Sequence, residues 1–118
     1  MIIKVDRVSY GEKNIIRAYT DQRIMMLNGK IIDFNIDEFV SRVLKMSESW
    51  PELMVDNSIF DITKYKVVIK ENENKKVFNF YGKYPDNLHE LNHLINEIVH
   101  PELMSLLAGR RETTSQKD

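Results

Sequence analysis

The sequence predicts an α+β fold, in which two main helices pack on one face of an antiparallel sheet of about six strands. Two observations lead to this prediction. Apolar and polar residues alternate along much of 2–34 and 65–81, which is the period of half-buried strands. Each of these regions is followed by a segment whose apolar residues recur every three or four positions, the spacing of an amphipathic helix.

The composition fits a single globular domain. The chain has 118 residues, of which 42% are hydrophobic and 30% are charged, and its formal net charge is −1. We assign residues 1–109 to one domain and 110–118 to a disordered polar tail. The balanced charge favours neither a nucleic-acid partner nor a membrane surface. The sequence has no cysteine and no recognisable signal peptide, so we expect a cytoplasmic protein without disulfides.

The first third of the chain predicts a four-stranded antiparallel meander. We expect strands at 2–10, 15–20, 23–27 and 30–34, separated by polar turn residues. The last two strands flank Asn28-Gly29, a pair that favours a tight hairpin because both residues tolerate a positive φ.

A helix is expected at about 36–47. Asn35 precedes it as an N-cap, and the apolar residues that follow lie on one face of the helix. The helix should end before Trp50-Pro51, since a proline disfavours helical geometry at the preceding residue. For 51–54 we expect no more than a short turn of helix.

The second half of the chain repeats this order. A strand is expected at 65–70, a return strand at 77–81 and a second helix at about 86–100. The apolar faces of the two helices should then form the core with the sheet. We expect the following residues to be buried: Phe39, Val43, Leu44, Leu91, Leu94, Ile95 and Ile98.

The segment from Phe39 to Ile98 resembles small bacterial proteins of unassigned function. The similarity lies in a helix followed by Trp50, then a strand hairpin, Tyr81-Gly82, Tyr84-Pro85-x-Asn87 and a second helix. It covers about half of the chain, and Ile62 stands where the pattern has a glycine after an aspartate. The resemblance implies a related fold without an activity, and it implies that Asn87 and Leu91 are structural.

One motif suggests a chemistry. His89-Glu90-Leu91-Asn92-His93 matches H-E-x-x-H, in which two histidines one helical turn apart bind zinc and the glutamate activates a water molecule. The motif therefore indicates a very small zinc metallopeptidase, with Glu90 as the catalytic base and His89 and His93 as metal ligands.

Two features of the sequence argue against this activity. A catalytic zinc site needs a third protein ligand, and His100 lies about 10 Å further along the helix than His93. Glu102 is the best downstream candidate, and Asp56 or Asp61 are upstream alternatives. The histidines also fall on the helix face opposite the leucine stripe. We therefore favour the interpretation that they are solvated surface residues, with no catalytic residue and no cofactor.

Two classes of function remain open. The first is a non-enzymatic protein-binding or regulatory module that acts through the free sheet face or an edge strand, with a protein partner or a second copy of the chain. Candidate contact residues are the strand tyrosines Tyr10, Tyr19 and Tyr65, which would form part of an exposed apolar patch. The alternative is the zinc metallopeptidase. The sequence predicts neither a nucleic-acid nor a membrane partner.

Overall fold

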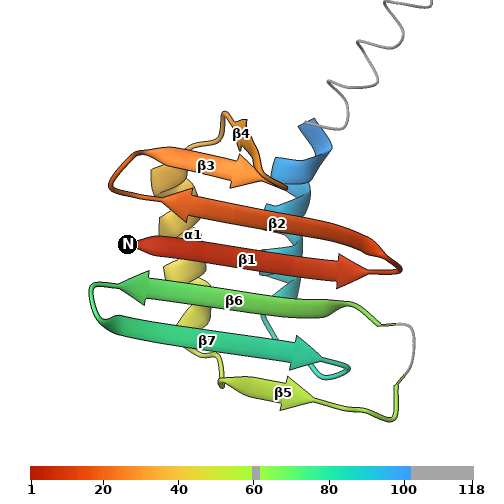
Figure 1. Cartoon of the computed structure of the whole chain (residues 1–118). Coiled ribbons are helices and arrows are strands. Elements are labelled where there is room, and N and C mark those ends of the chain that lie inside the picture. The colour runs from red at the N-terminus through yellow and green to blue at the C-terminus, as the bar shows by residue number, and fades with distance from the viewer. Residues whose placement is uncertain (60–61, 102–118) are drawn as a thin grey trace, which may run out of the picture.

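The computed structural model describes residues 1–59 and 62–101 and has an α+β fold (Figure 1). A helix at residues 88–101, here called the C-terminal helix, follows the last strand. The other elements are β1 (Ile2–Ser9), β2 (Glu12–Tyr19), β3 (Ile24–Leu27), β4 (Lys30–Ile32), α1 (Ile36–Ser47), β5 (Leu53–Val55), β6 (Lys64–Glu71) and β7 (Asn74–Tyr81). The predicted tail, 110–118, lies outside the described residues.

The predicted meander is present. Strands β1 to β4 pair in sequence order, each antiparallel to the next. Asn28 and Gly29 form the β3–β4 turn with φ values of 51° and 82°, as their sequence indicates. The Asn28 side chain also accepts a hydrogen bond from the backbone N–H of Ile15 at 2.7 Å, which ties this turn to β2.

The sheet differs from the prediction in two ways. The described residues form seven strands in the order β4-β3-β2-β1-β6-β7-β5, and the sheet is mixed. The predicted purely antiparallel sheet of about six strands was therefore wrong. The difference is β5, which pairs in parallel with β7. It begins two residues after Pro51, where a turn of helix was expected, and it has no alternation long enough to reveal a strand.

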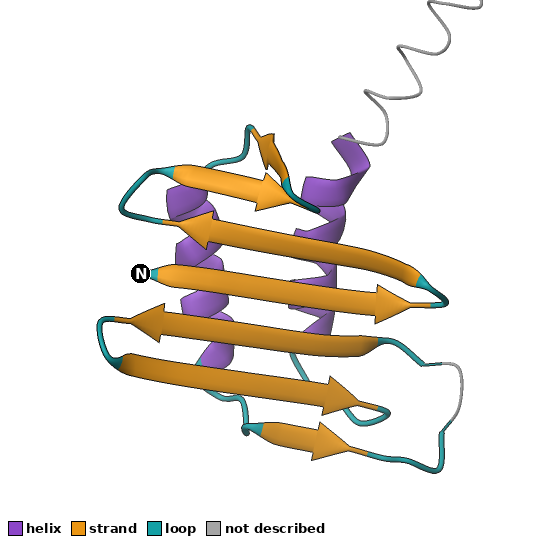
Figure 2. Cartoon of the chain, viewed as in Figure 1, coloured by secondary structure: helices purple, strands orange, loops and turns teal. Residues whose placement is uncertain are grey.

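Both helices lie on the same side of the sheet, and the other side is uncovered in the described part of the chain (Figure 2). Helix α1 begins where predicted, because the Asn35 side chain accepts a hydrogen bond from the N–H of Glu38 at 3.0 Å. Of the seven predicted core residues, six are buried and Leu44 is partly buried against the same core. The core therefore fills the space between the helices and one sheet face.

A hydrogen-bonded clasp joins the end of α1 to the start of the C-terminal helix. The Trp50 Nε1–H donates to the Asn87 side-chain oxygen at 2.6 Å, and the Asn87 amide donates to the carbonyl of Met46 at 3.0 Å. The indole also packs edge-on against Phe78 and Phe80 of β7. Two residues of the layout described above, Trp50 and Asn87, thus meet in space.

The segment after β7 makes a second close contact. Gly82 has φ +75°, and its Cα lies against the loop after β5, so that an added Cβ would be 2.3 Å from the carbonyl oxygen of Asp56. The N–H of Asp56 donates to the carbonyl of Tyr81 at 2.7 Å. Glycine is the residue that fits this position without strain.

Candidate functional site

One side of the sheet, here called the open face, is covered by no helix of the described residues (Figure 2). Buried strand residues such as Val5, Ile16 and Val67 point to the helices. Their neighbours along each strand therefore point the other way, because side chains alternate across a sheet. The cross-strand register places these neighbours in rows that run from β3 to β7 or from β2 to β5, for example Lys4 beside Val68.

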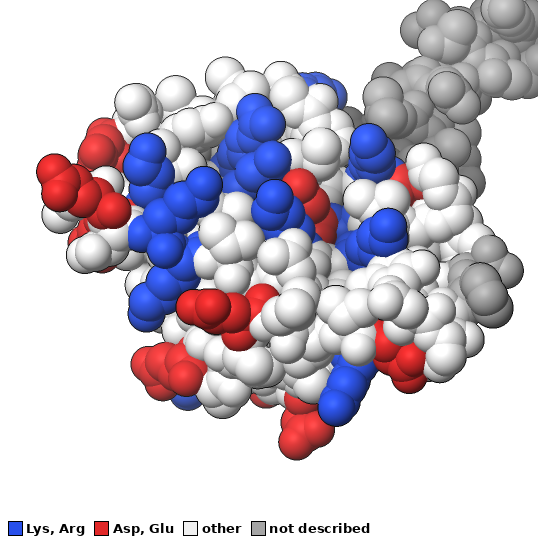
Figure 3. Space-filling view, turned by 60° about the horizontal axis from the view of Figure 1, so that its bottom comes forward, with Lys and Arg blue, Asp and Glu red and all other residues white. Residues whose placement is uncertain are grey.

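The charge on the open face is strongly one-sided. Among the described strand residues, it holds seven lysine and arginine residues and one acidic residue, Asp6. In Figure 3 the basic side chains gather over the strands in the upper half of the view, whereas most acidic side chains lie below them and at the margins. The seven residues, here called the basic set, are Lys4, Lys13, Arg17, Lys64, Lys66, Lys70 and Lys75.

Members of the basic set are placed directly opposite one another. Lys4 pairs with Arg17 across β1 and β2, and Lys70 pairs with Lys75 across β6 and β7. Such like-charge pairs destabilise a sheet, since their Cβ atoms are only about 5 Å apart. Asp6 offsets part of this charge, because its carboxylate lies 3.5 Å from the Lys4 ammonium.

The rest of the open face is mainly apolar. Among the described residues, four of the six most exposed large apolar side chains lie here, and two of them, Ile31 and Leu53, are 65% and 64% exposed. Ile31 is on β4 and Leu53 is on β5, so the two lie at opposite edges of the sheet. The basic set lies mostly between these edges. The open face thus combines apolar edges with a cationic centre.

The structure places the three candidate tyrosines in different environments. Tyr19 lies on the open face and is partly buried. Tyr10 is 82% exposed, but it lies in the β1–β2 turn, beyond the strands. Tyr65 points to the helices and is 7% exposed, and its hydroxyl donates to the Asn92 side chain at 3.0 Å. The proposed role of Tyr65 in partner contact was therefore wrong, because this ring belongs to the core.

The H-E-x-x-H segment lies on the C-terminal helix, and its two central residues fix its orientation. Leu91 is fully buried. The Asn92 side-chain oxygen accepts hydrogen bonds from Arg7 of β1 at 2.6 Å and from the Tyr65 hydroxyl. Burial lowers the pKa of Arg7, which also donates to the neutral amides of Asn14 and Asn96. The face with His89, Glu90 and His93 is consequently turned to solvent.

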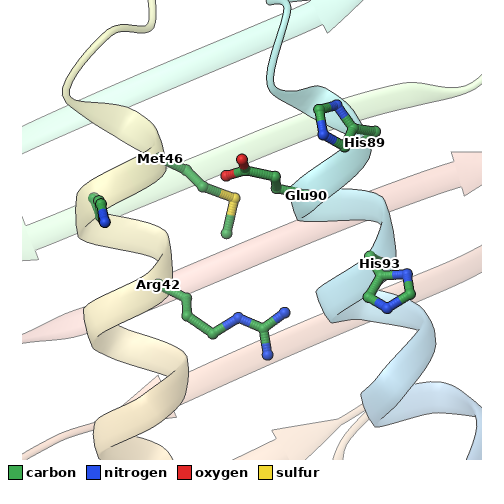
Figure 4. A pocket seen from close by; sticks show the side chains of 6 residues that line it. Arg42, Met46, His89, Glu90 and His93 are labelled. Atoms are coloured by element: carbon green, nitrogen blue, oxygen red, sulfur yellow. The ribbon is translucent and has the colours of Figure 1, made fainter.

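These three residues line a shallow groove of about 390 Å³ between the C-terminal helix and α1 (Figure 4). Glu90 reaches toward Met46 of α1, whereas the two imidazoles leave the helix on its outer side. The His89 Nδ1 lies 3.2 Å from the carbonyl oxygen of Asp86. Arg42 and Lys45 also line the groove, so its α1 wall is cationic.

An ion pair crosses this groove further along the helices. The Arg42 guanidinium donates to Glu97 at 2.7 Å, and this contact lowers the pKa of Glu97 and raises that of Arg42. Glu97 also lies 3.7 Å from the His93 Nε2. The carboxylate that contacts His93 is thus already held by an arginine.

The residues of this groove can be compared with the ligands that a catalytic zinc site needs. A catalytic zinc site has three protein ligands and an open position. Within residues 1–59 and 62–101, no group of three or more His, Asp or Glu side chains has the arrangement of a metal site. Glu102 and Asp61, two of the third ligands considered, lie outside the described residues. The described part of the chain therefore provides two imidazoles without a third ligand.

The basic set was not predicted from the sequence. Its signal is present in the alternation of β6, where Lys64, Lys66 and Lys70 occupy one face and the buried Tyr65, Val67 and Ile69 occupy the other. The net charge of −1 concealed this segregation, because the acidic residues lie elsewhere in the chain. The strand order was also needed, since it places β6 beside β1 and so joins the basic residues of both halves.

No helix of the described residues is long and apolar enough to cross a membrane. Searches of protein families, of curated proteins and of solved structures found no match to this chain.

Proposed function

We propose that this chain is a non-enzymatic module that binds another protein through the open face of its sheet. The observation that carries the proposal is the pairing of like charges on this face, Lys4 with Arg17 and Lys70 with Lys75. A face that serves only as a solvated surface is more stable when residues of opposite charge pair across its strands. On this face, by contrast, residues of like charge lie opposite one another and repel. A partner that supplies the opposite charge would relieve the repulsion.

The charge also favours a different protein over a second copy of this chain. Two open faces brought together would oppose the basic set of one copy to that of the other, which costs free energy in a desolvated contact. The exposed apolar residues at both edges, such as Ile31 and Leu53, supply the area that a protein contact buries.

Site-specific photo-crosslinking in cells of the source organism tests this function. A photoreactive residue at Asn79, on the open face, should give a covalent adduct with another protein, and so should one at the exposed Leu53. The matched control is Ser41, an exposed position on α1, which should give none. Equal adducts from both sides of the molecule, or adducts only with a second copy of the chain, would contradict the proposal.

The zinc metallopeptidase remains the alternative, and it rests on His89, Glu90 and His93. The contact between the His89 Nδ1 and the Asp86 carbonyl favours it, because metal-bound histidines commonly donate their second nitrogen in this way. Metal analysis of protein purified without a histidine tag tests it directly. One zinc per chain, lost in His93→Ala, with peptide cleavage lost in Glu90→Gln, would establish the peptidase in place of the binding module.

A further inference from the structure

We infer that the partner of the open face is an acidic protein segment with apolar residues on both sides of its carboxylates. This inference rests on the proposed function and adds the chemistry of the partner. The basic set lies on β2, β1, β6 and β7, in the middle of the sheet, and the Asp6 carboxylate lies between its members. A segment that crosses from β3 to β5 passes cations of three of these strands, Arg17, Lys4 and Lys66.

The apolar residues set the length of this segment. Ile24 and Met26 of β3 lie on the open face next to the edge strand β4, and Leu53 and Val55 lie on the opposite edge strand, β5. Five steps between neighbouring strands separate β3 from β5, which amounts to about 24 Å. An extended chain covers this distance with about seven residues. A short linear segment therefore reaches both apolar ends and places its central side chains over the basic set.

The aromatic residues argue against single-stranded nucleic acid as the partner. Proteins that bind it on a sheet stack the bases on exposed aromatic rings. Two tyrosines lie on the strands of the open face, Tyr19 and Tyr81, and both are partly buried. The Lys64 ammonium also lies 4.7 Å from the centroid of the Tyr81 ring and occupies one face of it. The large exposed side chains are aliphatic instead, and these fit the apolar side chains of a protein.

Asp6 allows a separate test of whether the open face binds an acidic ligand. Its carboxylate bridges to Lys4 at 3.5 Å, and its other oxygen, Oδ1, is buried without a hydrogen-bond partner in the described residues. Among the described residues, the Asp6 carboxylate is the one acidic group on the open face of these strands, and it repels an acidic ligand. Asp6→Asn should therefore strengthen binding of an acidic segment, whereas a purely structural role for this face predicts no such gain.

Fluorescence anisotropy with defined probes tests the inference. The ligand is a labelled peptide of about 12 residues with central glutamates between leucine-rich ends, and the reference peptide has glutamine in place of glutamate. The whole chain should bind the acidic peptide at least about tenfold more tightly than the reference peptide, and binding should weaken as salt screens the charges. Asp6→Asn should tighten binding severalfold.

A matched pair of double variants locates the contact. Arg17→Glu/Lys66→Glu reverses two exposed cations on the open face and should weaken binding at least about tenfold. Lys45→Glu/Lys76→Glu makes the same change of net charge at exposed positions on the helical side and should leave the affinity within about twofold. Circular dichroism and urea unfolding confirm that both variants remain folded.

The outcomes separate this inference from the proposed function. Binding of an oligothymidylate probe that depends on Arg17 and Lys66, without binding of the acidic peptide, would overturn the acidic partner but leave the open face as a binding surface. Crosslinking from Asn79 without peptide binding would likewise keep the proposed function and remove the inference. Equal losses in the two double variants, or no gain from Asp6→Asn, would also refute it.

Discussion

Gly82→Ala should destabilise this protein far more than the same change at Gly29. Both residues have a similar positive φ, +75° at Gly82 and +82° at Gly29, so both alanines carry the same conformational cost of about 1–2 kcal/mol. The surroundings differ. A Cβ at Gly29 meets nothing within 4 Å, whereas at Gly82 it would lie 2.3 Å from the backbone oxygen of Asp56.

A backbone oxygen cannot rotate away as a side chain can, so β5 or the end of β7 must move. Overpacking of this kind costs about 1–3 kcal/mol. The movement also strains the hydrogen bond from the Asp56 N–H to the Tyr81 carbonyl, which is 2.7 Å long. We therefore expect a loss of about 3–4 kcal/mol for Gly82→Ala and about 1–2 kcal/mol for Gly29→Ala.

Urea unfolding followed by circular dichroism measures both changes, with the slope of free energy against denaturant held common to the variants. Hydrogen exchange should locate the additional loss of protection in β5 and in the last residues of β7. If the two alanine variants lose the same free energy of unfolding, the close approach between Gly82 and the loop after β5 does not exist in solution.

Three further substitutions test other parts of the structure. Asn87→Ala should cost about 2 kcal/mol of unfolding free energy, because the indole N–H of the clasp loses its acceptor, whereas the exposed Asn74→Ala should cost less than about 0.5 kcal/mol. Lys70→Glu should raise the urea midpoint, since it replaces a cross-strand repulsion by an attraction. Glu97→Gln should reduce the loss of stability in acid: the folded pKa of Glu97 lies below its ordinary value of 4.5, so its contribution is present above that pH and disappears as the pH falls through the folded value. Urea midpoints at several pH values check this.

Local signals in the sequence were sufficient for much of the fold. The hairpin at Asn28-Gly29 and the helix start at Asn35 depend on residues within four positions of one another, so a short pattern determines them. The core faces of the helices follow for the same reason, since Phe39 and Leu91 belong to apolar stripes that any packed helix must bury. Elements of this kind are visible before any tertiary contact is known.

Nonlocal pairing explains what the sequence did not reveal. Strand β5 has three residues and is stabilised by its parallel contact with β7, about 25 positions away in the chain. Three residues are too few for an alternation of apolar and polar side chains that would distinguish a strand from a loop. The basic set required two nonlocal facts, the side each strand turns to the helices and the position of β6 next to β1. The tyrosines were an unreliable guide because Tyr65, at an apolar position of β6, faces the core.

The two like-charge pairs connect stability to the proposed function. Repulsion between directly opposite side chains costs up to about 1 kcal/mol for each pair, whereas a single acidic replacement would turn the cost into a gain. Lys70 and Lys75 are both exposed, so packing does not require either to be a lysine. If the pair serves binding, Lys70→Glu has opposite effects in two assays: the folded state becomes more stable, and the acidic peptide binds more weakly. If the face is only a solvated surface, the variant gains stability without any loss of binding. The sign of the two changes together therefore decides whether the repulsion has a function.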